Sequence, residues 1–261
     1  MMDALLVERL GGELFAALKE CRTLPPLTSR EPSITIDDAY RISLDFLKRR
    51  RETGERVVGK KIGVTSRVVM DMLGVHQPDF GFLTDTMQVP SGSAVSVAGR
   101  LIQPRAEAEI AFQLKDSLKG PGVGEAAVLA ATASIHPCFE IVDSRITDWK
   151  IRIEDTIADN ASCGLFVLGP PTDPEGFDFE TCGVVVRKND EIVSTGAGAA
   201  ALGSPLSAVA WLANTLGRYG ISLEAGDIIL SGSLVPLEPA HPGDRFHAKI
   251  AGLGETSITF A

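Results

Sequence analysis

Residues 104–112 read Pro-Arg-Ala-Glu-Ala-Glu-Ile-Ala-Phe, a run in which charged and apolar residues alternate. Alternation with a period of two is typical of a β-strand, whose successive side chains point to opposite faces. Glu107 and Glu109 therefore share one face of a predicted strand and lie close together. Because two ionised carboxylates at that spacing repel each other, one must take up a proton or a cation must lie between them.

A third carboxylate follows in a second predicted strand, residues 138–143 (Cys-Phe-Glu-Ile-Val-Asp). The apolar neighbours of Glu140 leave it no polar face, and a lone charge there is costly. Three converging glutamates would form an all-oxygen ligand set, which suits Mg²⁺ or Mn²⁺ rather than Zn²⁺. A second interpretation stays open, because alternating polar residues usually mark the solvent-facing side of a strand and would leave Glu107 and Glu109 exposed.

Two residues upstream are candidates for proton transfer. Residues 57–64 form a β-branched run broken by glycines, which predicts a strand. Lys60 and Lys61 face opposite sides of that strand, so at most one points inward. An inward Lys61 would neutralise charge or move protons, whereas two exposed lysines on an edge strand are the alternative. Asp79 lies in a predicted loop, residues 77–81, and is either a general acid or base or a turn residue.

The composition of the chain limits its class. It has 261 residues, 44% of them hydrophobic and 23% charged, which is typical of one large globular domain. A net charge of −9 argues against partners such as nucleic acid or an anionic membrane surface. No apolar run reaches the ~18 residues of a membrane span. The four cysteines are far apart in sequence, and together with the absence of a secretory signal they indicate a cytoplasmic protein.

The remaining pattern predicts an α+β, β-rich fold. Helical periodicity over residues 3–20 and 37–52 predicts an N-terminal helical segment, residues 1–55, that packs on a β-rich catalytic domain, residues 56–261. Strands and helices do not alternate regularly, so a doubly wound parallel sheet is not expected. Further strands are predicted at 86–97, 106–113, 161–168, 182–187, 191–195, 227–232, 244–250 and 255–260. Further helices are predicted at 66–73, 125–134 and 205–219.

Motifs along the whole chain resemble the hydratase/decarboxylase branch of the fumarylacetoacetate hydrolase superfamily. The motifs that carry the resemblance are GKKIGVTS (59–66), QPDFG (77–81), PRAEAE (104–109), EIVDSR (140–145), ADNAS (158–162), TGAGAA (195–200) and LSGS (230–233). Within this branch, residues 160–169 and 231–239 are more similar to the hydratases than to the decarboxylases.

The resemblance implies a fumarylacetoacetate hydrolase-like mixed β-roll core with peripheral helices and a metal site in its mouth. It implies that Mg²⁺ or Mn²⁺ is bound by three glutamates: Glu107, Glu109 and Glu140. It also implies a pair of residues near the reacting carbons, Lys61 and Asp79. Two serines match candidate substrate-contact positions, Ser162 and Ser233.

The implied activity is metal-dependent addition of water to 2-hydroxypenta-2,4-dienoate, a dienol carboxylate also written as 2-oxopent-4-enoate. The product is 4-hydroxy-2-oxopentanoate, in the meta-cleavage route of aromatic catabolism. The resemblance also implies a homo-oligomer and a complex with 4-oxalocrotonate decarboxylase. Two alternatives stay open: the chain is that decarboxylase, or it is a non-catalytic partner subunit of it. A third, a C–C bond hydrolase, needs a His/Glu pair, for which His136 in a predicted loop is the candidate.

Overall fold

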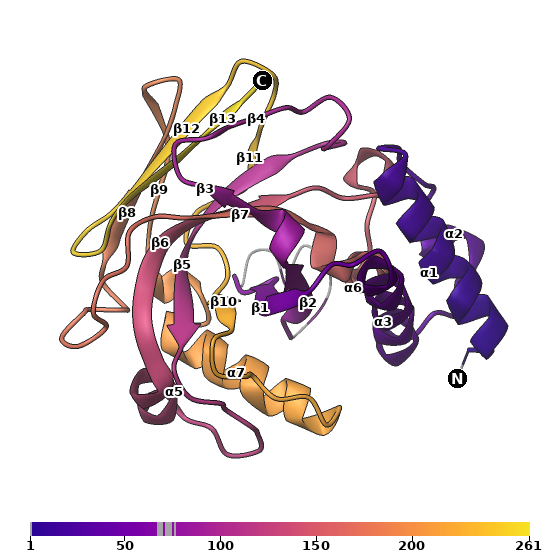
Figure 1. Ribbon diagram of the computed structural model, residues 1–261, viewed down its shortest axis with the longest axis horizontal. Helices are drawn as coiled ribbons and strands as arrows, with labels where there is room; N and C mark the ends of the chain where they lie inside the picture. The colour runs from indigo at the N-terminus through magenta and orange to yellow at the C-terminus, as the bar shows by residue number, and fades with distance from the viewer. Residues whose placement is uncertain (1, 67–69, 71–74, 76) are drawn as a thin grey trace.

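The computed structural model describes residues 2–66, 70, 75 and 77–261, and it contains two β-sheets. The larger sheet has eight strands and is strongly curled (Figure 1). In spatial order its strands are β2 (Asp79–Thr84), β1 (Val57–Gly63), β10 (Ile228–Leu230), β5 (Arg105–Leu114), β6 (Thr132–Val142), β7 (Cys163–Leu168) and β3 (Gln88–Pro90), and β11 (Glu238–Pro239) pairs with β5.

The two longest strands, β5 and β6, pair antiparallel in the middle of this sheet. Their register sets Glu107 opposite Glu140 and Ala108 opposite Phe139. Successive side chains alternate between faces, so the glutamates point to one face while Ala108 and Phe139 point to the other. Both faces of β5 are buried. The interpretation of Glu107 and Glu109 as exposed residues on the solvent-facing side of a strand is therefore wrong.

The smaller sheet packs on the face of β6 that carries Phe139. Its strands, in order, are β4 (Ala94–Val95), β13 (Gly254–Phe260), β12 (Arg245–Ile250), β8 (Gly183–Lys188) and β9 (Glu191–Ala197). The rings of Phe139 and Phe246 meet edge to face, with centroids 6.2 Å apart, and Phe246 meets Phe260 in the same way. This apolar layer fills the outer face of the larger sheet and leaves the inner face for the glutamates.

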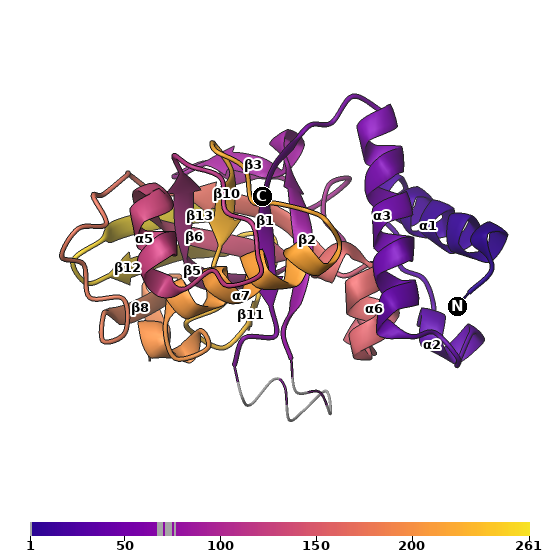
Figure 2. The ribbon, with the colours of Figure 1, turned by 90° about the horizontal axis from the view of Figure 1, so that it is seen from below.

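Helices cover the remaining sides of the larger sheet (Figures 1 and 2). The N-terminal layer consists of α1 (Ala4–Lys19), α2 (Leu27–Arg30) and α3 (Ile36–Glu52) and packs on α6 (Ile153–Ala158). Thr35 caps α3 by accepting a hydrogen bond from the Asp38 backbone N–H. Two further helices, α5 (Glu125–Ala131) and α7 (Pro205–Arg218), pack together at another side. Short 3-10 turns are η1 (Asp85–Met87), η2 (Thr147–Trp149), η3 (Asn160–Ser162) and η4 (Gly198–Ala200).

The α+β, β-rich fold with an N-terminal helical layer is confirmed. The division of the chain at residue 55 stays a prediction, because Leu10 and Phe46 of the layer belong to the same hydrophobic core as the sheets. The loop predicted for residues 77–81 is wrong, since β2 begins at Asp79 and its backbone pairs with β1. His136 lies within β6 rather than in a loop.

Two further predictions differ from the structure or lie outside it. The strand predicted for residues 86–97 is wrong, because a turn at Gly92, with φ of 82°, separates two short strands. The helix predicted for residues 66–73 falls mostly on residues outside those described.

Candidate active site

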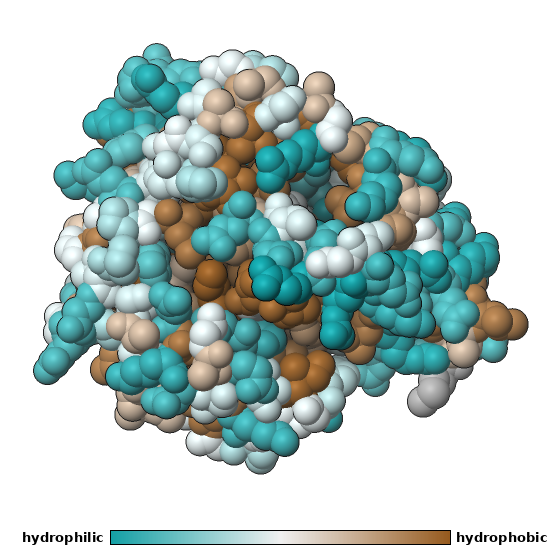
Figure 3. All heavy atoms as spheres, in the orientation of Figure 1, coloured by the Kyte–Doolittle hydropathy of each residue, from teal (hydrophilic) through white to brown (hydrophobic). Residues whose placement is uncertain are grey.

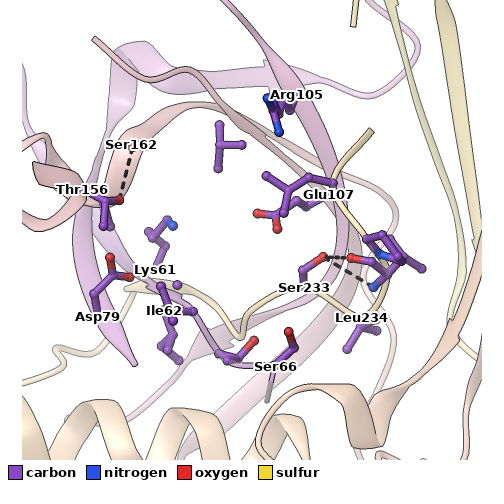
Figure 4. A pocket seen from close by; sticks show the side chains of 18 of the residues that line it. Lys61, Ile62, Ser66, Asp79, Arg105, Glu107, Thr156, Ser162, Ser233 and Leu234 are labelled. Atoms are coloured by element: carbon purple, nitrogen blue, oxygen red, sulfur yellow. Dashed lines mark hydrogen bonds between the residues drawn. The ribbon is translucent and has the colours of Figure 1, made fainter. Parts of the chain in front are cut away.

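A cavity of about 550 Å³ opens where the larger sheet curls. Figure 4 shows side chains from β1, β2, β5, α6, η3 and the segment after β10 converging on it. In the space-filling view, hydrophobic residues gather toward the middle of the molecule, while hydrophilic residues cover the helical layer (Figure 3). The cavity wall is mostly apolar, with a small number of polar groups, which is typical of a site for a small ligand.

Three buried glutamates form a cluster at this cavity. One carboxylate oxygen from each of Glu107, Glu109 and Glu140 lies within 4.8 Å of the others. The backbone N–H of Gly232 donates to Glu109 Oε2 at 2.8 Å. Within the described residues, Glu109 Oε1 and Glu140 Oε2 are buried without a hydrogen-bond partner, and Glu140 Oε1 has only the Lys61 ammonium, 3.3 Å away. Because unpartnered buried carboxylate oxygens are costly, these orphaned atoms fit a hard divalent cation such as Mg²⁺ or Mn²⁺.

The raised pKa values of Glu107 and Glu109 also indicate that this cluster lacks positive charge. Burial and the neighbouring Glu140 raise the pKa of Glu107 to about 8. Burial, with Glu140 and Glu107 next, also raises the pKa of Glu109 well above its usual value. Without a cation these two carboxyl groups therefore hold protons near neutral pH, and a bound cation would displace them.

Lys61 enters the cavity from β1 (Figure 4). Its Nζ lies 3.3 Å from Glu140 Oε1, and the Lys61 side chain is only 3% exposed. Burial lowers the pKa of Lys61, but the carboxylates of Glu140 and Asp79 raise it by more. The net pKa is therefore above its usual value, and the ammonium form persists. Lys60 points to the opposite face and forms a buried ion pair with Asp227. The alternative of two exposed edge lysines is therefore wrong.

Asp79, the first residue of β2, lies beside Lys61 because a glycine leaves the space. Gly63 pairs with Asp79 across the two strands, and a methyl group at Gly63 would overlap Asp79 Oδ1 and come within 3.0 Å of Lys61 Nζ. Burial raises the pKa of Asp79 to about 6, although the Lys61 ammonium lowers it. Among the described residues, neither carboxylate oxygen of Asp79 has a hydrogen-bond partner. Asp79 is therefore able to gain or lose a proton near neutral pH.

The two predicted serines lie on different walls of the cavity (Figure 4). Ser162 ends η3, where residues 160–162 all have positive φ, and Asn160 fixes this turn by bonding to both backbone groups of Phe82. Ser162 Oγ lies 3.2 Å from Thr156 Oγ. Ser233 Oγ donates to the Val235 carbonyl at 2.6 Å.

Most of the predicted site residues line one cavity, together with several residues that the sequence pattern did not single out. Lys61, Asp79, Glu107, Ser162 and Ser233 line it, and Glu109 and Glu140 cluster with Glu107. The missed lining residues include Thr156, Arg105 and Trp149. The alternation that pairs Glu107 with Glu109 also places Arg105 on the same face, so that signal was available. No such signal marks Thr156 on a short helix.

His136 does not supply the His/Glu pair that the hydrolase alternative needs. Its Nδ1 lies 3.0 Å from the Gly169 carbonyl, and its Nε2 lies 3.0 Å from Ser134 Oγ. Among residues 2–66, 70, 75 and 77–261, no histidine lines the cavity.

Known proteins share this chain's sequence pattern. The family described as "Fumarylacetoacetate (FAA) hydrolase C-terminal" matches residues 59–261. The chain belongs to the fumarylacetoacetate hydrolase family. Within this family, a 2-hydroxyhexa-2,4-dienoate hydratase of Comamonas testosteroni is 58% identical over 262 residues, covering 100% of this chain and 99% of that protein. A 2-hydroxypent-2,4-dienoate hydratase of Pseudomonas putida is 62% identical over 222 residues, covering 85% of this chain and all of that protein.

A solved structure in the fumarylacetoacetate hydrolase family has nearly the same backbone. It is a 4-oxalocrotonate decarboxylase from Pseudomonas putida G7, complexed with magnesium and adipate. Its TM-score is 0.97 at 37% identity, and the match covers 100% of this chain and 99% of that one. Within the described residues, no helix is both long and apolar enough to cross a membrane.

Proposed function

We propose that this chain is a hydratase that adds water to 2-hydroxypenta-2,4-dienoate, giving 4-hydroxy-2-oxopentanoate in meta-cleavage aromatic catabolism. One observation carries this proposal. The chain is 62% identical over 85% of its length to a 2-hydroxypent-2,4-dienoate hydratase, and 58% identical over its full length to a hydratase named for the dienoate one carbon longer. The buried carboxylates beside Lys61 and Asp79 support it, because they bring a candidate cation site and two candidate proton-transfer groups to one cavity.

We assign the cation to Glu107, Glu109 and Glu140, and we propose Mg²⁺ or Mn²⁺ as its identity. The all-oxygen donor set and the unpartnered oxygens of Glu109 and Glu140 support this assignment. When bound, a divalent cation supplies positive charge that stabilises negative charge developing on the oxygen at C2 of the substrate.

The overall reaction needs four proton movements, two losses and two gains. The enol hydroxyl loses a proton as C5 gains one, water then adds at C4 and loses a proton, and C3 gains a proton. We propose that Lys61 and Asp79 carry these protons, supported by their adjacent positions at Gly63. The ammonium of Lys61 is a proton donor, and Asp79, with a pKa of about 6, accepts and returns protons near neutral pH.

Ser162 and Ser233 are proposed to contact the substrate from different walls of the cavity. The hydroxyl of Ser233 donates to the Val235 carbonyl, and its oxygen accepts from the Val235 N–H at 3.4 Å, so one lone pair of this oxygen remains as an acceptor. Ser162 shares a hydrogen bond with Thr156, and this pair faces the cavity near Asp79 (Figure 4).

We also propose a cytoplasmic homo-oligomer that associates with 4-oxalocrotonate decarboxylase. The nearly identical backbone of a decarboxylase from Pseudomonas putida G7 supports a shared mode of assembly. Three buried free cysteines, Cys138, Cys163 and Cys182, support a reducing compartment. Co-purification of the two enzymes, followed by light scattering, tests the association.

The experiment that tests the activity is an assay of the chelator-treated protein with two acids offered separately, 2-hydroxypenta-2,4-dienoate and 4-oxalocrotonate. We expect added Mg²⁺ or Mn²⁺ to restore formation of 4-hydroxy-2-oxopentanoate from the dienoate, without CO₂ release from oxalocrotonate. CO₂ release would instead identify the chain as the decarboxylase. No turnover of either acid by metal-loaded protein would favour the non-catalytic subunit.

A further inference from the structure

Arg105 lies on the same face of β5 as the acidic cluster. Arg105, Glu107 and Glu109 are two residues apart along the strand, so their side chains project in the same direction. Arg105 lines the cavity, and Figure 4 shows it at the edge of the cavity beyond Glu107. This face of β5 thus carries a guanidinium at one end and the candidate cation site at the other.

A tryptophan fixes the plane of this guanidinium. Arg105 Cζ lies 4.7 Å from the centre of the Trp149 ring, a cation–π contact. Trp149 is itself anchored, since its Nε1 donates to the Gln103 carbonyl at 3.1 Å. The Gln103 amide in turn donates to the carbonyls of Ser144 and Ile146, at 2.8 and 2.5 Å. Hydrogen bonds therefore hold in place the Trp149 ring against which Arg105 packs.

The guanidinium donors of Arg105 have no partner in the described part of the chain. No carboxylate there lies within 4.0 Å of its guanidinium, and the guanidinium N–H groups make no hydrogen bond to those residues, whereas the Trp149 ring lies against it. Arg145 provides the contrast, because its N–H groups are satisfied by Asp159, Asp143 and Cys163. A guanidinium that stacks through one face keeps its N–H edge free, and that edge matches a carboxylate in two parallel hydrogen bonds.

We propose that Arg105, held against Trp149, is a carboxylate-binding residue of the cavity and recognises the acid group of a 2-oxo acid. This inference rests on the proposed function for the substrate class. The carboxylate has two possible sources: the acid group at C1 of the substrate, or a second acid group at the far end of a dicarboxylic substrate. The mostly apolar wall between the polar groups suits the carbon chain of either.

The test measures binding without turnover. Trp149 and Trp211 are the two tryptophans of the chain, so Trp211→Phe makes Trp149 the reporter of events at Arg105. In that background, Mg²⁺-loaded protein is titrated with 2-oxopentanoate and with 2-oxoadipate, which differ by the second carboxylate. The variants are Arg105→Met and Arg105→Lys. Lys150→Met is the matched control, because it removes an exposed positive charge next to Trp149.

We expect Arg105→Met to weaken binding at least tenfold, Arg105→Lys to weaken it less, and Lys150→Met to leave it within twofold. If Arg105→Met loses affinity equally for both acids, Arg105 binds the C1 carboxylate. If it loses affinity for 2-oxoadipate alone, Arg105 binds the second carboxylate. Unchanged affinity of Arg105→Met for both acids overturns the proposal. Because binding is read by fluorescence, a wild-type protein that binds both acids but hydrates no dienoate would count against the proposed function alone.

Discussion

Lys60 and Lys61 are neighbours in sequence, yet β1 sends their side chains to opposite faces. Lys60 forms a buried pair with Asp227, and Lys61 lies 3.3 Å from Glu140 at the cavity. At the scale of single residues, the two-residue period of a strand predicted that the two lysine side chains lie on opposite faces. It did not predict which one is inward, because that depends on the strands that pair with β1.

Replacing Lys61 tests its part in proton transfer. We expect Lys61→Ala to lower kcat by about 10²–10⁴-fold, because it removes the ammonium donor at the cavity, while Mg²⁺ still binds. Steady-state kinetics and metal titration measure the two effects. The matched control is Lys60→Met with Asp227→Leu, which removes a buried ion pair as a unit from the other face of the strand. A kcat for Lys61→Ala equal to that of the control removes Lys61 from the mechanism.

Replacing Asp79 tests its titration. Burial raises the pKa of Asp79 to about 6, so its carboxylate form grows as pH rises through that value. We expect kcat of the wild type to change near pH 6 and that change to disappear in Asp79→Asn. A rise through pH 6 identifies the carboxylate as the working base, and a fall identifies the acid. The same change persisting in Asp79→Asn would assign it to another group.

At the scale of elements, the site depends on how strands pair. Alternation in β5 showed that Glu107 and Glu109 share a face, and apolar neighbours marked Glu140 as unusual. The register that sets Glu107 opposite Glu140 joins residues far apart in the chain, and single-strand patterns carry no such information. The same limit explains Asp79: Pro78 and Gly81 suggested a loop, but pairing with β1 extends the segment as a strand.

An aromatic stack joins the N-terminal layer to the site. The Tyr40 ring of α3 lies over Phe80 with centroids 4.2 Å apart and planes 12° from parallel, and Phe80 follows Asp79. We expect Tyr40→Leu to lower stability by about 1–3 kcal/mol and kcat by about tenfold or more, because the start of β2 loosens.

The control for this substitution is Leu44→Ala, which truncates an exposed residue of α3. Thermal unfolding and kinetics at a temperature where both variants are folded separate stability from rate. A Tyr40→Leu variant with wild-type kcat would show that α3 supports the fold without positioning Asp79.

At the scale of the whole molecule, the curled sheet gathers more negative charge than the protein alone can neutralise. Burial raises the pKa of Glu107 to about 8 and that of Glu109 well above its usual value. The folded, metal-free protein therefore binds protons more tightly than the unfolded chain. That contribution to stability is fully present below the unfolded pKa of Glu107, near 4.5, and is lost as pH rises through about 8.

The melting temperature of chelator-treated protein should accordingly fall between pH 5 and pH 9. Mg²⁺ binds the ionised carboxylates, so its stabilising effect should grow over the same range. Glu107→Gln should flatten the metal-free profile, because glutamine does not titrate. Differential scanning calorimetry at matched ionic strength measures the melting temperatures of metal-free wild type, Mg²⁺-loaded wild type and metal-free Glu107→Gln. A metal-free melting temperature of the wild type that rises with pH would contradict this account.

The central claim is that Glu107, Glu109 and Glu140 hold one divalent cation. The most direct measurement is a Mn²⁺ titration followed by electron paramagnetic resonance, which counts free Mn²⁺, on wild type and Glu109→Gln. The account predicts one tightly bound Mn²⁺ per wild-type chain and none in the variant, with both proteins folded by circular dichroism. Equal binding by the two proteins would place the cation elsewhere and contradict the claim.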